Sequence, residues 1–203
     1  YDVVPSQDDT IIAQDWINRI KEEIAEISDY EEIQSFVNMN ADNRYVDRYY
    51  KQGDFSSNID SVLFAADTNY IEGPFLEDAA YKVIKLIEIA KRPDSINARH
   101  ILISLSENGD SSHIKKADSI LNLVNSGADF ALLAQASSAD PGSAANGGDL
   151  GWFSEGTMVK PFNDSCFSSK PGDLIIVYTQ FGAHIIEVLD RTEPIKKIKV
   201  AII

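Results

Sequence analysis

The two halves of the sequence repeat one plan, and this repeat constrains the fold more than any other feature. Each half opens with a short apolar run, at residues 3–5 and again at residues 101–104. Each run is followed by apolar residues at helical spacing, which predicts an amphipathic helix. These positions are Ile12, Trp16, Ile20, Ile24 and Ile27 in the first half, and Ile114, Ala117, Ile120 or Leu121, and Val124 in the second.

The later parts of the two halves also correspond. The Gly-Asp-Phe of residues 53–55 matches the Gly-Trp-Phe of residues 151–153, and residues 59–64 match residues 162–167. Each half then ends in a pair of β-rich runs. The runs are residues 71–75 with 80–89 in the first half, and 173–178 with 183–189 in the second.

The resulting order is strand, helix, helix, short helix, strand and strand. This order predicts an α+β unit with helices packed on a small antiparallel sheet. A repeat of about 95 residues is too long for a solenoid, so we expect two tandem domains. The polar segment at residues 91–97 contains Pro93, which blocks a helix or an inner strand, and predicts the linker. The predicted domains are residues 1–94 and 95–191, and residues 192–203 form a tail expected to pair as a strand.

Composition excludes several classes of protein. The 203 residues carry 32 Asp and Glu against 18 Lys and Arg, a net charge of −14 at pH 7. This charge argues against binding to nucleic acid or to an anionic membrane surface. No segment approaches the roughly 20 apolar residues of a membrane-spanning helix, and no secretory signal opens the sequence. Because the first residue is Tyr1, we expect a processed or excised piece whose parent carries any signal or membrane anchor.

Three histidines are the main candidates for chemistry. His113 lies among Ser and Lys residues at the start of a predicted helix, where we expect a solvated side chain with no role. His100 and His184 lie on the first and last predicted strands of the second half. A single strand histidine is usually a hydrogen-bonded core residue, and two on neighbouring strands leave both a core role and a site open.

Other familiar sites are disfavoured. Cys166 is the only cysteine, so no internal disulfide or cysteine metal cluster can form, and two histidines without a third ligand make a poor zinc site. The glycine-rich segment at residues 138–153 contains neither a Walker nor a dinucleotide-binding pattern. We therefore expect no metal and no cofactor.

Residues 98–191 resemble a parvulin-type peptidyl-prolyl cis/trans isomerase domain. Five ordered motifs carry the resemblance, which makes it more specific than any single glycine-rich loop. They are Ala98-Arg99-His100-Ile101-Leu102-Ile103, Ser138-Ala139-Asp140-Pro141-Gly142-Ser143, the segment from Gly147 to Phe153, Gly156-Thr157-Met158-Val159-Lys160-Pro161-Phe162, and Phe181-Gly182-Ala183-His184-Ile185-Ile186.

The resemblance implies a set of site residues. The family's paired histidines fall on His100 and His184, and its central acidic or cysteine position falls on Asp140, with Thr179 joining this polar group. The apolar surface that receives the substrate proline falls on Leu150, Met158, Phe162 and Phe167. Phosphate-directed parvulins carry a basic cluster after the first strand, whereas residues 104–110 contain no Lys or Arg, so we expect no preference for phosphorylated substrates.

Residues 1–96 resemble the same fold in a degenerate form. The resemblance rests on the order of elements and on residues 70–75 and 81–86. The position of His100 falls near Asp2 and Val3, that of His184 near Tyr81, and no Asp-Pro-Gly-Ser loop is present, so we expect this half to be structural or peptide-binding. The tandem arrangement resembles periplasmic folding factors of the SurA, PrsA and PpiD kind. It implies a periplasmic or other extracytoplasmic location, and unfolded or nascent polypeptides with X-Pro bonds as partners.

Isomerisation of X-Pro bonds needs neither a nucleophile nor a metal, because the barrier of ~20 kcal/mol arises from amide resonance and no covalent bond breaks. An apolar pocket that favours the twisted amide, with the histidine group tuning its electrostatics, would suffice. The alternative is a non-catalytic chaperone module that only holds extended segments. In that case Met158 and Phe162 are plain core residues.

Overall fold

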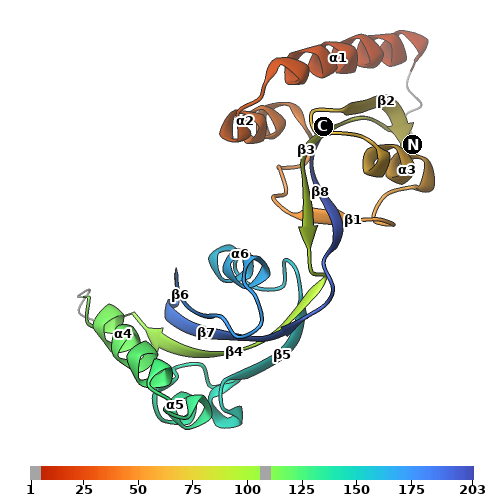
Figure 1. Ribbon diagram of the computed structural model, residues 1–203. Coiled ribbons are helices and arrows are strands. Elements are labelled where there is room, and N and C mark those ends of the chain that lie inside the picture. Colours follow the sequence, from red (N-terminus) through yellow and green to blue (C-terminus); the bar gives the residue numbers. More distant parts are fainter. Residues whose placement is uncertain (1–5, 106–110) are drawn as a thin grey trace, which may run out of the picture. The chain divides into compact units, whose positions relative to one another are not determined.

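Figure 1 shows the computed structural model, which describes residues 6–105 and 111–203. The chain divides into two compact units. Unit 1 comprises Tyr1–Lys91 together with Lys196–Ile203, and unit 2 comprises Arg92–Ile195. The apolar run expected at residues 3–5 lies outside the described residues.

Unit 2 contains a four-stranded sheet in the order β5-β4-β7-β6, and each neighbouring pair is antiparallel. Its strands are β4 (Ser95–Ser104), β5 (Asp149–Ser154), β6 (Leu174–Thr179) and β7 (Gly182–Arg191). Its helices are α4 (Ser112–Asn125), α5 (Phe130–Ser137), the 3-10 turn η1 (Ala144–Asn146) and α6 (Lys160–Ser168). This is the predicted antiparallel sheet with packed helices.

Alternation along the central strands separates two cores in unit 2. Ile101 and Ile185 point to one face, where they pack with Ala117 and Phe130 of α4 and α5. The other face carries a core built on α6, whose buried members are Ile96, Ala98, Phe153, Phe162, Cys166, Phe167, Val177, Ile186 and Val188. The histidines share this second face, since His100 follows Ala98 by two residues and His184 precedes Ile186 by two.

Unit 1 contains a second four-stranded sheet, in the order β1-β8-β3-β2. Its strands are β1 (Tyr49–Lys51), β2 (Ile71–Glu77), β3 (Ala80–Arg92, whose last residue belongs to unit 2) and β8 (Ile195–Ile202), and its helices are α1 (Gln7–Glu26), α2 (Tyr30–Asn40) and α3 (Ser57–Ala65). Helices α1 and α2 share a core with one face of the sheet, and α3 packs on the other. No helix within the described ranges is both long enough and apolar enough to cross a bilayer.

Helix α1 begins at a capping box, in which Ser6 and Asp9 bond each other's backbone amides. Its buried stripe differs from the predicted one. Ile12 and Trp16 are 67% and 39% exposed, and burial begins at Ile17 and continues through Ile20 and Ile24. The prediction of those first two core positions was wrong because only the C-terminal half of the helix packs on the sheet.

The predicted linker at residues 91–97 is also shorter than expected. Strand β3 continues to Arg92 and β4 begins at Ser95, so only Pro93 and Asp94 lie outside strands. Thr192 fixes this break, because its hydroxyl oxygen accepts hydrogen bonds from the amides of Asp94 and Ser95 at 2.8 and 3.1 Å. Proline suits the gap since it has no amide hydrogen that would need a partner.

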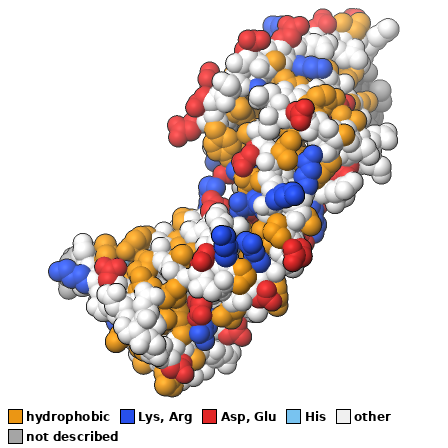
Figure 2. Space-filling view, viewed as in Figure 1, with side chains coloured by type: hydrophobic (Ala, Val, Ile, Leu, Met, Phe, Trp, Pro, Cys, Tyr) orange, Lys and Arg blue, Asp and Glu red, His pale blue; other side chains and the backbone are white. Residues whose placement is uncertain are grey.

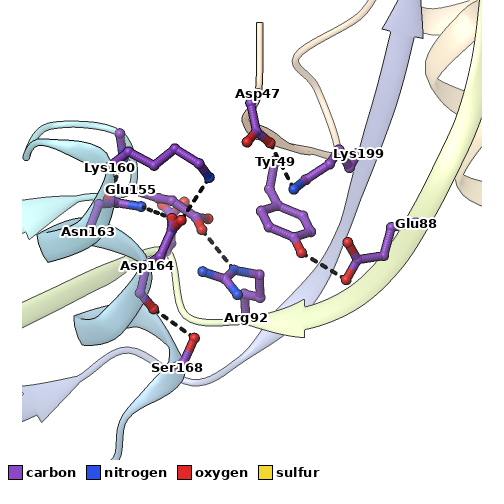
Figure 3. A network of polar contacts seen from close by, with 12 residues as sticks. Asp47, Tyr49, Glu88, Arg92, Glu155, Lys160, Asn163, Asp164, Ser168 and Lys199 are labelled. Atoms are coloured by element: carbon purple, nitrogen blue, oxygen red, sulfur yellow. Dashed lines mark hydrogen bonds and ion pairs between the residues drawn. The ribbon is translucent and has the colours of Figure 1, made fainter. Parts of the chain in front are cut away.

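Each unit also contains a well-shielded ion pair (Figure 3). In unit 1, Lys199 of β8 lies 2.8 Å from Asp47, ahead of β1. In unit 2, the Nε of Arg92 donates to Glu155 at 2.7 Å, with side chains only 14% and 9% exposed. Removing one member of such a shielded pair leaves a poorly solvated charge, so these contacts fix local geometry.

Lys85 is the most buried charged residue described, at 1% exposure. Its ammonium group donates to the carbonyl oxygens of Ile24, Ala25 and Ile27, at the C-terminal end of α1. The last carbonyls of a helix have no partner within the helix, and they carry the negative end of its dipole. A lysine from the sheet therefore serves as the cap of α1.

Replacing this cap should loosen α1. We expect Lys85→Met to destabilise unit 1 by about 2 kcal/mol, because buried carbonyls lose charge-assisted donors while the aliphatic volume is kept. Hydrogen exchange of α1 amides, followed by mass spectrometry, should become faster. Lys91→Met, at an exposed position of the same strand, is the control. Equal protection of α1 in both variants would contradict the capping role.

Candidate active site

Four polar residues predicted from the sequence meet on the α6 side of the unit 2 sheet. His100 comes from β4, His184 from β7 and Thr179 from the end of β6. Asp140 comes from the loop between α5 and η1. The register places His100 opposite Ile186 and His184 opposite Leu102, so the two imidazoles are diagonal neighbours on adjacent strands.

These side chains form one continuous chain of hydrogen bonds. The Nδ1 atoms of His100 and His184 lie 3.2 Å apart, and the rings stack with an interplanar angle of 22°. The Nε2 of His100 lies 2.8 Å from Oδ2 of Asp140, and the Nε2 of His184 lies 2.8 Å from Oγ1 of Thr179. Both histidines are almost fully buried, at 6% and 5% exposure.

Ser143 is a fifth member of this network that sequence reasoning missed. It is buried, and its hydroxyl donates to Oδ2 of Asp140 at 2.5 Å and lies 3.1 Å from Nε2 of His100. One feature of the sequence could have predicted this role. Ser143 lies three residues after Asp140 within the same motif, and Asp and Ser at this spacing can bond across a turn.

Local turns hold Asp140 against the sheet. The amide of Gly142 donates to its Oδ1 at 3.1 Å. Ser138 links the loop to β4, since its hydroxyl oxygen accepts from the amides of Leu102 and Asp140. The carboxylate is therefore positioned by backbone contacts before it meets His100.

Gly148 allows this loop to approach the first histidine closely. Its amide belongs to a turn closed on Ser143, and its carbonyl accepts the amide of His100 at 2.8 Å. Its φ is +83°, and a Cβ there would lie 2.2 Å from the carbonyl oxygen of His100. Only glycine fits such a position without moving the strand.

Phe162 forms the apolar surface under the histidines. Its ring meets those of His100 and His184 edge-on, with centroid distances of 5.7 and 5.2 Å. It is only 2% exposed, so most of the ring is already covered by protein.

The other predicted pocket residues lie at two depths. Leu150 and Met158 are partly buried and pack against the edge of the α6 core. Phe167 is buried in that core, where its ring meets Phe153 at 6.0 Å. Leu150 and Met158 are thus partly accessible, whereas Phe167 is enclosed in the core.

Hydrogen bonding keeps Asp140 ionised. The bond from Ser143, followed by those from His100 and Gly142, outweighs desolvation and lowers the pKa of Asp140 to about 2. Its nearest partners must therefore be donors at neutral pH. An anion satisfied by several donors is also a poor nucleophile, which argues against attack on a carbonyl carbon.

The carboxylate fixes one hydrogen of the network. Because ionised Asp140 can only accept, the Nε2 of His100 carries its hydrogen. The two Nδ1 atoms share one hydrogen bond, and the Nε2 of His184 bonds the hydroxyl of Thr179, whose oxygen accepts the amide of Phe181 at 3.1 Å. The hydrogen bonds are therefore continuous from Thr179 to Asp140.

Burial favours the neutral form of His184. Desolvation, with a further contribution from nearby His100, lowers the pKa of His184 to about 4, although Asp140 opposes the shift. The only thiol is inert, since burial raises the pKa of Cys166 to about 12. Within residues 6–105 and 111–203, no three His, Cys, Asp or Glu side chains are grouped to hold a metal ion. The arrangement suits a dry, polarised binding surface.

Comparison with known proteins identifies the family. Residues 81–192, more than half of the chain, match the family described as the PPIC-type PPIase domain, also named Rotamase_3. The chain belongs to the PPIC-type peptidyl-prolyl isomerase family. The matched region contains every member of the hydrogen-bonded network and all four apolar residues beside it.

Curated relatives match part of the chain. It is 46% identical over 99 residues to the "Foldase protein PrsA" of Geobacillus sp. (strain WCH70), covering 48% of this chain and 33% of the relative. It is 36% identical over 138 residues to the "Chaperone SurA" of Pseudomonas fluorescens (strain Pf0-1), covering 65% of this chain and 32% of the relative. The chain thus spans about a third of the length of these relatives.

A solved structure also aligns with part of the chain. The crystal structure of a peptidylprolyl isomerase (PrsA) from Bacillus anthracis is 33% identical, and the alignment covers 51% of this chain and 44% of that one with a TM-score of 0.44.

The pKa of His184 makes the stability of unit 2 depend on pH. The unfolded chain binds a proton with the ordinary pKa of 6.5, whereas the folded unit does so only near pH 4. Unfolding therefore takes up a proton between these values, and stability is lost as the pH falls through this window. The loss should amount to about 3 kcal/mol.

Urea unfolding between pH 4 and 7 measures this effect. A Trp16→Phe background leaves Trp152 as the fluorescence reporter of unit 2. His184→Gln should flatten the pH dependence, while His113→Gln should keep it. An unchanged slope in His184→Gln would show that this ring does not carry the proton linkage.

Proposed function

We propose that unit 2 is a catalytically active isomerase of X-Pro bonds in unfolded polypeptides. The observation that carries the proposal is the hydrogen-bonded chain Thr179–His184–His100–Asp140 above the ring of Phe162. It combines a fixed polar group with an adjoining apolar surface, within a chain of the PPIC-type family.

The chemistry requires stabilisation of a twisted amide. Rotation about the peptide bond removes resonance, so the carbonyl becomes less polar and the nitrogen lone pair becomes localised. A site that excludes water disfavours the polar planar amide relative to the twisted one. Leu150 and Met158 would contact the proline ring, and Phe162 closes the surface behind them.

The histidines and Asp140 would position and polarise this surface without forming a bond to the substrate. Asp140 fixes His100 through one ring nitrogen, and Thr179 fixes His184 from the opposite end of the chain. Both imidazoles are thereby locked against Phe162 before substrate arrives. Such preorganisation costs nothing at the moment of reaction, which is how fixed dipoles contribute most to catalysis.

The proposed substrates are unfolded or nascent chains outside the cytoplasm. Relatives named foldase and chaperone support this class of partner. We propose no preference for phosphorylated residues before proline. Residues 104–110 contain no Lys or Arg in the sequence, and residues 106–110 of this stretch lie outside the described residues.

Isomerase assays on an unphosphorylated X-Pro tetrapeptide test the site. His100→Ala and Asp140→Ala should each lower kcat/KM by about tenfold or more, because each variant breaks the chain that orients both rings. A protease-coupled assay measures the rate. His113→Ala is the matched control and should retain full activity.

Full activity in both site variants would refute the assignment of these residues. The same assay with phosphoserine before proline examines selectivity. We expect kcat/KM for the phosphorylated peptide to be no higher than for the unmodified one, and a clear gain would contradict the proposed substrate class.

The names of the relatives favour a second candidate, a chaperone that holds chains without isomerising them. Trp152 and Phe181 of unit 2 are each about half exposed, so they offer apolar contacts to an unfolded chain. Suppression of aggregation of a reduced, unfolded protein should be measured on the same samples. If wild type suppresses aggregation but lacks isomerase activity, the chaperone alone is correct. If Asp140→Ala loses isomerase activity only, both functions are present.

A further inference from the structure

Unit 1 has the strand order of unit 2 if β8 takes the place of β4. The order β1-β8-β3-β2 then corresponds to β5-β4-β7-β6. The pair β8 and β3 is antiparallel like β4 and β7, since Val83 and Ile203 exchange both backbone hydrogen bonds. In each unit, two helices pack on one face of the sheet and a short helix packs on the other.

A loop before the short helix supports the correspondence at the level of residues. In unit 2 the amide of Gly156 donates to the side chain of Asn163 at 2.7 Å, and in unit 1 that of Gly53 donates to Asp60 at 2.9 Å. Residues 59–64 therefore do correspond to 162–167. The predicted match of residues 53–55 with 151–153 was wrong, because Gly53 corresponds to Gly156.

The same register locates the site positions in unit 1. The hairpin pairs Thr179 with Gly182 in unit 2 and Glu77 with Ala80 in unit 1, so Lys82 corresponds to His184. Lys82 bonds Glu77 at 2.9 Å, in place of the bond between His184 and Thr179. This moves the expected position from Tyr81 by one residue.

The position of His100 falls on the C-terminal strand. His100 lies opposite Ile186, which corresponds to Ile84, and Ile84 lies opposite Ile202 by continuing the Val83–Ile203 pair. An isoleucine therefore stands where the first histidine would be. The sequence prediction had placed this position near Asp2 and Val3.

Unit 1 contains a cavity of about 240 Å³ beside the two positions that correspond to the histidines of unit 2. Its wall includes Lys82 and Ile202, together with the loop after α2, which corresponds to the loop that carries Asp140. That loop contributes three polar or charged residues to the lining, and the rest of the lining is apolar or aromatic. The polar ones are Asp42, Asn43 and Arg44, and the others are Ala41, Tyr45, Val46, Tyr50, Ala80, Tyr81, Val200 and Ile203. Lys82 and Ile202 thus stand in place of the stacked imidazole pair, and the cavity lies beside them.

We propose that this cavity, the unit 1 pocket, binds a bulky apolar side chain of an unfolded polypeptide without isomerising the chain. The volume suits one large side chain, and tyrosine rings offer apolar contact with little loss of conformational entropy. The choice of an unfolded polypeptide rests on the proposed function of unit 2. Lys82 is held by Glu77, so no pair of rings is available for catalysis.

The net charge of unit 1 indicates which polypeptide segments would bind the pocket best. Residues 1–91 and 196–203 carry 19 Asp and Glu against 11 Lys and Arg, a net charge of −8. Figure 2 shows acidic side chains along α1 on the visible face of this unit. The preferred occupant is therefore an apolar segment with neutral or basic flanks.

Titration of the isotope-labelled full chain with a proline-free peptide tests the proposal by NMR. The probe has a Phe-Leu-Phe centre flanked by lysines, and a second probe carries glutamates instead. Signals of residues 41–46 and of Tyr81 and Ile202 should shift, and the lysine probe should bind more tightly. Shifts confined to unit 2 would overturn the proposal.

Variants at the pocket rim separate binding from folding. Val46 lines the pocket and is 55% exposed, so Val46→Asp should weaken binding about fivefold by removing apolar contact. Val62→Asp, at an exposed valine of α3 that does not line this pocket, is the matched control. Ala80→Trp fills the pocket from an exposed position and should weaken binding in the same way.

Isomerase activity distinguishes failure of this proposal from failure of the proposed function. The rim variants should retain activity on the tetrapeptide, and Asp140→Ala should retain binding of the proline-free probe. Equal affinities in Val46→Asp, Ala80→Trp and Val62→Asp, in samples with native-like spectra, would refute the pocket.

Discussion

Strands β4 and β7 pair from Ile96 opposite Arg191 to Ser104 opposite Gly182, and this ladder fixes where both histidines lie. Because alternate residues face opposite sides, one face supplies a core for α4 and α5 while the other carries the imidazoles. A shift of one residue would turn both rings into the wrong core. The hydrogen-bonded chain from Thr179 to Asp140 depends on this register.

The network has a second constraint, the partly exposed carboxylate of Asp140. Asp140 remains ionised because Ser143, His100 and Gly142 donate to it, and its charge fixes the hydrogen on the Nε2 of His100. The rings of both histidines lie edge-on against Phe162. The polar group and the apolar floor form one preorganised surface.

The two units show how one arrangement can be kept while its chemistry is lost. The loop bond to Asn163 has its counterpart in Asp60, so the backbone geometry around the short helix is shared. The histidine positions are occupied by Lys82 and Ile202 instead. The proposed consequence is a division of labour, with isomerisation in unit 2 and capture of apolar side chains in unit 1.

The sequence by itself determined the elements of unit 2 and most of the residues that meet in the candidate site, because periodicity and ordered motifs are local signals. It missed Ser143, whose role depends on a turn that folds against His100. It also missed the source of the central strand of unit 1. Pairing of β8 with β1 and β3 joins residues more than a hundred positions apart, and only tertiary structure decides such contacts.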